Sequence, residues 1–145
     1  MAGSFVASGV VFRLSVLYAV CMDDIFKVHL LPSELLSDAI EIIEDRGWRQ
    51  YGNYDIAIKD GDLCGRVCMM GACSAAVSLA GSAIIPYFQN PFDQEPDNFR
   101  EATEELVAQV NGRVPQFWND NEGRTKEEVI TLLNKARVAL EARGR

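Results

Sequence analysis

The stretch from Asp62 to Ala80, DLCGRVCMMGACSAAVSLA, constrains the fold of this chain more than any other part of the sequence. Small and apolar residues almost exclude charge from it, and Arg66 is its single charged residue after Asp62. A run of this kind, bounded by turn residues, is typical of the buried centre of a domain and is too short to span a membrane. We therefore predict a central packing helix over residues 62–80, with Asp62 as its N-cap.

Size and charge set the class of protein. The chain has 145 residues, of which 48% are hydrophobic and 24% are charged, as expected for one globular domain with its own core. Its formal net charge of −7 argues against direct nucleic-acid binding, because phosphate binding relies on Lys and Arg. An acidic chain could instead dock on a basic partner or mimic a nucleic acid, provided that its carboxylates gather on one face.

The first 31 residues differ from the rest, and we treat residues 1–31 as an N-terminal extension to a single helical domain over residues 32–145. The apolar run near the N-terminus contains Arg13, which is costly in a membrane span, and it lacks the features of a secretory signal. Its β-branched and aromatic residues favour a strand, and Met22 is an alternative start site. Four cysteines without a secretory signal indicate reduced thiols and a cytoplasmic protein.

The rest of the chain predicts a mainly α, compact four-helix domain. Residues 32–46 begin with a proline, carry apolar residues at helical spacing and stop at Gly47. Residues 98–111 show the same spacing, and a capping box at residues 125–128 opens the last helix. The stretch from 62 to 80 supplies the fourth helix.

The connections between these helices are expected to be irregular. Alternating residues over Tyr54–Ile58 predict a short extended or β element, and residues 81–97 and 113–124 are predicted loops. Small residues of the central helix should let the other helices approach closely: Gly65, Gly71, Ala72, Ala75 and Ala76. Their predicted contacts are Phe99, Leu106, Leu132 and Leu133.

Four short motifs occur in one order along the chain: Arg46-Gly47-Trp48, Cys68-x-x-Gly71-Ala72, Trp118-Asn119-Asp120 and Gly123-Arg124-Thr125-x-x-Glu128-Val129. Together they resemble a family of unknown function found in actinobacteria and their bacteriophages, over about residues 33–140. Cys64, Cys73 and the segment before Leu31 depart from the family pattern. The family has no activity that could be transferred to this chain. The resemblance therefore implies a phage-related origin and little chemistry. It directs attention to Trp48, Cys68, Trp118, Asn119 and Asp120.

The cysteines of the central stretch are candidates for a metal site or a nucleophile. On one helix Cys64 and Cys68 would share a face while Cys73 would not, so they are weak candidate ligands for a zinc ion that requires four. Free cysteines buried as small hydrophobic residues are the favoured interpretation. A thiol such as Cys68 near a helix N-terminus can instead be an activated nucleophile. Asp120 would then have to serve as base, since the single histidine, His29, lies outside the recognisable core.

Trp118, Asn119 and Asp120 are the best candidates for binding a ligand or partner. An aromatic side chain and two short polar ones before a capped helix suit this role, and Trp48 could line the same pocket. The favoured interpretation is nevertheless structural: Trp118 fixes the loop to the core, and Asp120 organises the turn toward Thr125.

No nucleotide-binding, hydrolase or dinucleotide motif occurs in the sequence, and no cofactor is predicted. The sequence therefore favours a small, acidic, non-enzymatic interaction or regulatory protein that binds a protein partner or a small ligand. The alternative is a cysteine-dependent enzyme centred on Cys68, with Asp120.

Overall fold

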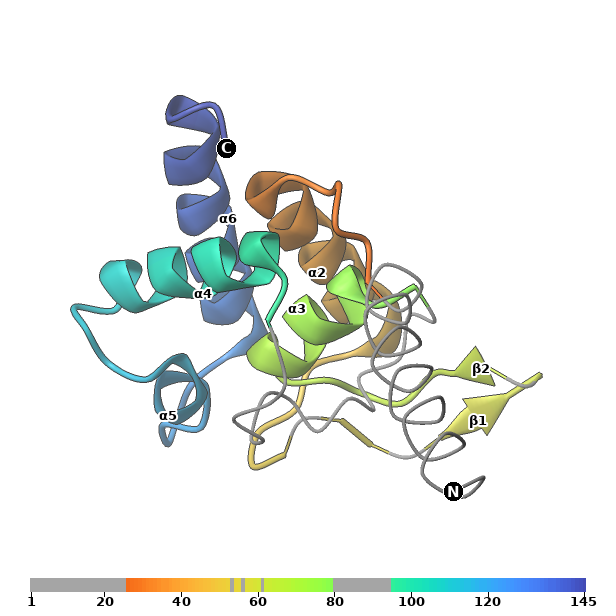
Figure 1. The fold of residues 1–145 in the computed structure, drawn as a ribbon. Coiled ribbons are helices and arrows are strands. Elements are labelled where there is room, and N and C mark those ends of the chain that lie inside the picture. The colour runs from red at the N-terminus through yellow and green to blue at the C-terminus, as the bar shows by residue number, and fades with distance from the viewer. Residues whose placement is uncertain (1–25, 53, 56, 61, 80–94) are drawn as a thin grey trace, which may run out of the picture.

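A computed structural model describes residues 26–52, 54–55, 57–60, 62–79 and 95–145 of the chain (Figure 1). The described part is mainly helical with little β structure, as the sequence predicts. The predicted N-terminal strand, the alternative start at Met22 and nearly all of the predicted loop over residues 81–97 lie outside the described residues.

The described residues form five helices: α2 (Pro32–Arg46), α3 (Met69–Val77), α4 (Asp97–Gln109), α5 (Pro115–Asn119) and α6 (Lys126–Ala142). α3 lies at the centre and packs chiefly against α2, with further contacts to α4 and α5 (Figure 1). α2 and α4 both pack against α6. α5 replaces part of a predicted loop, and Pro115 at its start suits the first turn because that position needs no N–H donor.

The central helix is shorter than predicted and begins at Met69. Asp62, the predicted N-cap, instead belongs to strand β2 (Asp62–Leu63), and Cys68 is the N-cap residue. The reason is that the backbone before the helix pairs with another segment. The N–H of Val67 donates to the carbonyl of Gly47 at 3.0 Å, and Val67 bridges both Trp48 and Tyr54. These pairings hold the chain extended where the sequence alone favours helix.

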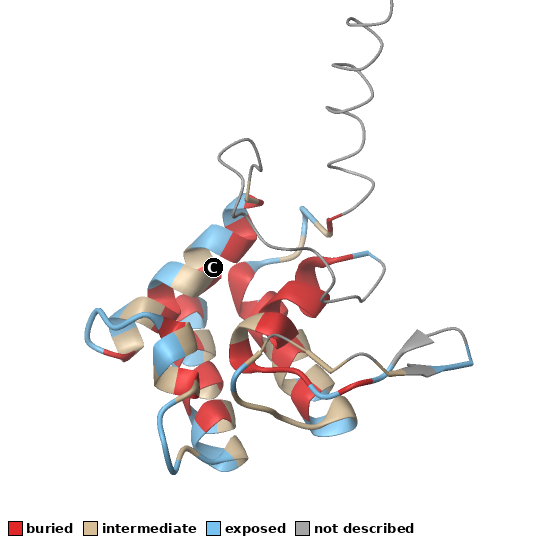
Figure 2. Ribbon diagram, turned by 90° about the horizontal axis from the view of Figure 1, so that it is seen from below, coloured by how far each residue is buried: buried red, intermediate tan, exposed pale blue. Residues whose placement is uncertain are grey.

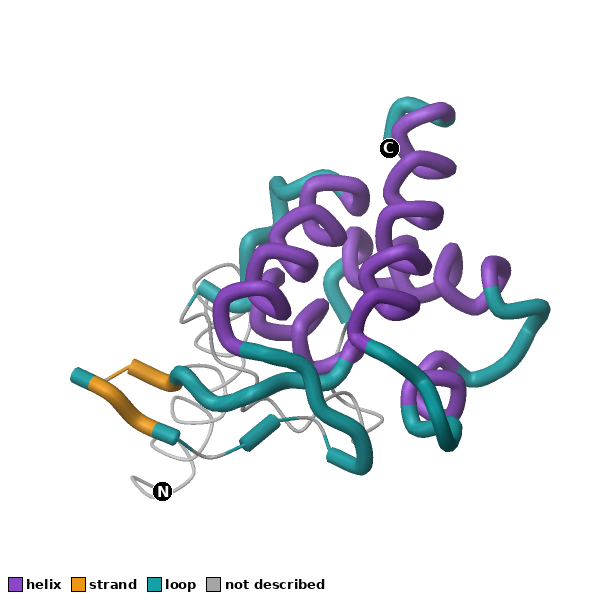
Figure 3. The backbone as a smooth tube through the Cα atoms, turned by 180° about the vertical axis from the view of Figure 1, so that it is seen from behind, coloured by secondary structure: helices purple, strands orange, loops and turns teal. Residues whose placement is uncertain are grey.

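Strand β2 pairs antiparallel with β1 (Ile58–Lys59) in a small hairpin that extends away from the helices (Figure 3). The predicted extended element is thus present but shifted toward residue 59, and Tyr54 contributes only an isolated bridge. Gly65 is required beside the hairpin, because a Cβ there would lie 2.0 Å from the backbone oxygen of Asp55. A glycine at position 65 therefore lets its backbone lie against the backbone of Asp55.

The core surrounds α3, whose residues are almost all buried (Figure 2). The predicted core contacts Phe99, Leu106, Leu132 and Leu133 are all buried as well. Four of the five predicted small residues lie in α3, where short side chains let α2 approach; Gly65 lies before the helix. The prediction of a central packing helix rich in small residues is therefore correct, but the helix is shorter than predicted.

Local signals at the other helices agree with the structure. Thr125 and Glu128 form the predicted capping box of α6, with the Thr125 Oγ1 accepting from the N–H of Glu128 at 3.2 Å. At the other end of α6 the chain is fixed to α4. Arg143 pairs with the nearly buried Glu105 at 2.9 Å, and Arg145 pairs with Glu101.

Candidate functional site

Asn119, at the end of α5, is the centre of a buried polar network. Its side chain has no exposed surface. Its Oδ1 accepts from the indole Nε1 of Trp48 at 2.8 Å and from the backbone N–H of Met69 at 3.1 Å. Its Nδ2 donates to the carbonyl of Arg49 at 3.3 Å and to Asp120 at 2.9 Å. All four hydrogen-bonding positions of the amide are filled, so Asn119 joins α5, α3 and the segment after α2.

Asp120 ties the following turn to the same segment. Its Oδ1 accepts from the backbone N–H of Tyr51 at 2.9 Å, and its Oδ2 accepts from Gln116 Nε2 at 3.3 Å. Gln50 strengthens the connection, because its Nε2 donates to the carbonyls of Asn119 at 3.0 Å and Asn121 at 2.8 Å. Both carboxylate oxygens of Asp120 therefore have protein partners.

Cys68 borders this network, and its burial opposes activation as a nucleophile. Its thiol is fully buried, accepts from the N–H of Gly71 at 3.2 Å and lies 3.6 Å from Gln116 Oε1, to which it donates. Burial raises the pKa of Cys68, and the negative charge of Asp120 raises it further, although the Gly71 and Met70 N–H groups act in the opposite direction. The helix N-terminus therefore does not outweigh burial.

The other cysteines do not assemble a metal site with Cys68. Cys64 lies before α3 and is exposed, so the predicted shared helix face of Cys64 and Cys68 is wrong. Cys73 is completely buried, and burial raises its pKa to about 12. No group of three His, Cys, Asp or Glu side chains among the described residues is placed to hold a metal ion.

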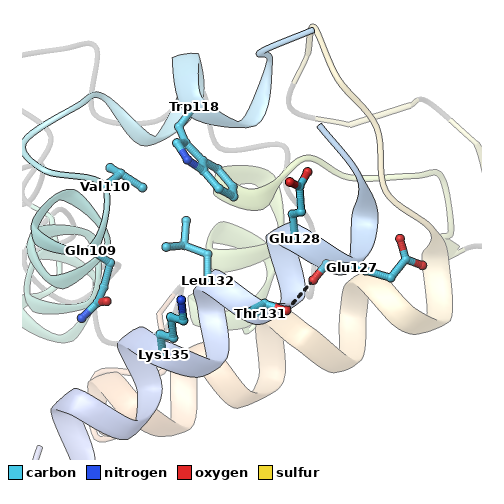
Figure 4. A pocket seen from close by; sticks show the side chains of 8 residues that line it. All are labelled: Gln109, Val110, Trp118, Glu127, Glu128, Thr131, Leu132 and Lys135. Atoms are coloured by element: carbon cyan, nitrogen blue, oxygen red, sulfur yellow. Dashed lines mark hydrogen bonds between the residues drawn. The ribbon is translucent and has the colours of Figure 1, made fainter. Parts of the chain in front are cut away.

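Trp118, the residue before Asn119 in α5, lines an open hollow of about 380 Å³ (Figure 4). We call this the Trp118 hollow. Its walls come from the end of α4, from α5 and from the first half of α6: Gln109, Val110, Trp118, Glu127, Glu128, Thr131, Leu132 and Lys135. Its volume falls within the range of small-molecule sites, roughly 300–1,000 Å³.

Arg124 covers part of Trp118. Its guanidinium carbon lies 3.7 Å from the centroid of the Trp118 ring, and its Nε donates to the Trp118 carbonyl at 3.0 Å. A second hollow, of about 570 Å³, shares Gln109, Thr131 and Lys135 with the first and continues along α6. The open surface thus runs from Trp118 past Lys135 toward the end of the helix.

The structure separates the residues that the sequence singled out. Trp48, Asn119 and Asp120 meet in the buried network, with Cys68 beside it, whereas Trp118 alone of these faces the hollow. Sequence reasoning missed Gln116 and Lys135, and it predicted Leu132 only as a core residue. Helical spacing was the available signal, because Leu132 and Lys135 lie three residues apart on one helix face.

The fold and the site define a small helical protein with a buried asparagine network and an open, aromatic-lined hollow. The chain matches the model of a family of unknown function (DUF6197) over residues 28–139, and it belongs to that family. The predicted membership of a family of unknown function is confirmed at this level. Neither the curated proteins nor the solved structures include a match.

None of the helices in the described ranges combines the length and apolar character that crossing a membrane requires.

Proposed function

We propose that this chain is a small, non-enzymatic binding protein of regulatory function and that the Trp118 hollow is its ligand site. One observation carries the proposal: Trp118, Val110 and Leu132 form an apolar wall in a hollow of ligand size, with polar groups at its edge. Small-molecule sites combine these features, an apolar lining with a few placed polar groups. The ligand belongs to the same cellular compartment as the protein, which we expect to be the cytoplasm of a bacterial host.

In this proposal Trp48, Asn119 and Asp120 position the site and do not touch the ligand. The Asn119 amide and the Asp120 carboxylate already have protein partners for their polar atoms. Because α5 is only five residues long, these bonds determine where Trp118 stands. A rigid support of this kind lowers the entropy lost when a ligand is bound.

The cysteine-dependent enzyme is the weaker hypothesis. A thiol nucleophile needs a substantial fraction of thiolate near neutral pH, which requires a lowered pKa or an adjacent base. Burial raises the pKa of Cys68, and its fully buried side chain leaves no surface for a substrate to reach. The phage-related origin rests on the motif resemblance and adds only that the ligand would be a host metabolite.

Tryptophan fluorescence tests the proposal, because the chain has two tryptophans and only Trp118 lines the hollow. The unmodified protein retains both tryptophans and the bond from Trp48 to Asn119, and the Trp118→Phe variant leaves Trp48 as a matched control. Nucleotides and small-molecule fractions of a bacterial lysate are titrated into both, after circular dichroism has verified their folding.

We expect a saturable change in emission from the protein that retains Trp118 and none from the protein that retains only Trp48. An emission change confined to Trp48, or no change with any fraction, would contradict the proposal.

A further inference from the structure

We infer that the Trp118 hollow binds a small amphipathic organic anion, with an apolar body against Trp118 and Leu132 and a negative group on Lys135. This inference rests on the proposed function and adds the chemical class of the ligand. It follows from which charges around the hollow already have partners.

The guanidinium of Arg124 already occupies the place next to Trp118 and Glu128 where a cationic ligand would bind. Tryptophan faces and carboxylates attract cations, and Trp118 stands next to Glu128 in the hollow. Arg124 serves both groups: it stacks over the Trp118 ring at 3.7 Å, and its Nη1 lies 3.6 Å from Glu128 Oε1. A cationic ligand would have to displace an intramolecular guanidinium that is also anchored to the Trp118 carbonyl.

The two carboxylates that line the hollow, Glu127 and Glu128, are poorly placed to bind a ligand. The second oxygen of Glu128, Oε2, accepts from the N–H of Thr125 at 2.8 Å in the capping box. Glu127 points away from Trp118, toward the outside of α6 (Figure 4). The negative groups near Trp118 are therefore engaged or turned outward.

Lys135 is the cation that lines the hollow, and its ammonium has no partner among the described residues. All seven ion pairs among the described residues use arginine as the cation, and the side chain of Lys135 makes no hydrogen bond or ion pair with a described residue. Its side chain points toward Leu132 and the hollow (Figure 4). An ammonium beside an apolar wall suits a carboxylate or sulfonate attached to an apolar group.

Helix geometry sets the length of the ligand. Lys135 follows Glu128 by seven residues, so the two Cα atoms lie about 10 Å apart along α6 at a rise of about 1.5 Å per residue. Leu132 lies between them on the same face. A ring joined to an acid by a short chain matches this span, and 4-phenylbutyrate is such a molecule.

Three ligands of one shape and different charge test the inference: 4-phenylbutyrate, 4-phenylbutanamide and 4-phenylbutylamine. Each is titrated into the unmodified full chain, and the change in tryptophan emission is compared with that of the Trp118→Phe variant. We expect the acid to bind about two- to five-fold more tightly than the amide, as for an exposed ion pair, and the amine to bind most weakly. The preference should shrink as salt is added.

Lys135→Gln provides the decisive variant, and Lys126→Gln is its matched control on the same helix outside the hollow. We expect Lys135→Gln to bring the acid and the amide to equal affinity and Lys126→Gln to leave the preference intact. Equal binding of acid and amide to the parent protein, tightest binding of the amine, or a preference that survives Lys135→Gln overturns the inference while the proposed site stands. Failure of all three ligands to perturb Trp118 counts against both.

Discussion

Replacing Asn119 by leucine should destabilise the fold by about 2–4 kcal/mol, although leucine has the same branching and number of heavy atoms. The side chain is fully buried, so its hydrogen bonds have no water to replace them. Leucine would leave the buried N–H of Met69 without an acceptor and would orphan the half-buried indole N–H of Trp48. Each buried donor left unpaired costs about 1–3 kcal/mol, and partial hydration of the indole keeps the sum below the maximum.

Urea unfolding followed by circular dichroism measures this cost. We expect a lower midpoint with an unchanged slope, and a thermal midpoint that falls by about 3 °C for each kcal/mol lost. Asn121→Ala is the matched control, because Asn121 is exposed in the adjacent turn and uses only its backbone in hydrogen bonds. Its free energy of unfolding should stay within about 0.5 kcal/mol of the parent.

A double-mutant cycle with Trp48→Phe isolates the indole bond. With no indole N–H to orphan, Asn119→Leu should cost about 1 kcal/mol less in the Trp48→Phe background. Strict additivity would show that this hydrogen bond contributes nothing. A cost of Asn119→Leu below about 0.5 kcal/mol would refute the description of Asn119 as the centre of the network.

Three further predictions concern the thiols, the hairpin and the C-terminal ion pair. Iodoacetamide at neutral pH, followed by peptide mapping, should label the exposed Cys64 in the native protein and label Cys68 only after denaturation; native labelling of Cys68 would contradict its raised pKa. Gly65→Ala should cost about 1–3 kcal/mol in a thermal melt, because its Cβ would lie 2.0 Å from a backbone oxygen; an unchanged melt would exclude that close approach. Arg145 lowers the pKa of Glu101 by hydrogen bonding and charge, so the pair stabilises the protein above the ordinary carboxyl pKa of 4.5 and loses this effect as the pH falls through the lowered value. Arg145→Gln should therefore lower the free energy of unfolding slightly at pH 7 and not below pH 3, and a loss that grows with acid would refute the assignment.

Helices α2, α4 and α6 could be predicted because the signals that form them are local. Pro32 and Gly47 delimit α2, and the Thr125 capping box opens α6. These features act within one turn of the chain, and the apolar stripe between them then packs on the core. A helix can be predicted from sequence when residues at its own ends determine where it begins and stops.

The start of α3 and the partners of Asn119 could not be predicted, because both depend on residues that are far away in the sequence. Residues 62–67 carry no proline or other helix breaker apart from Gly65. Their extended conformation comes from pairing: strand β2 pairs with β1, and Val67 bridges Trp48 and Tyr54. The bond from Trp48 to Asn119 joins residues 71 positions apart. Spacing along a helix or strand gives no information about such contacts.

The four motifs behind the family resemblance contribute to two features next to α5, the buried network and the Trp118 hollow. Trp48, Cys68 and Asn119 lie in or beside the network, whereas Trp118 and the Arg124 motif form the edge of the hollow.

A ligand at ten times its dissociation constant should stabilise the native protein by about 1.4 kcal/mol. If the network holds Trp118 in place, Asn119→Leu should weaken ligand binding as well as the fold, whereas Gly65→Ala should affect the fold alone. Measuring both quantities for both variants separates support of the site from general stability.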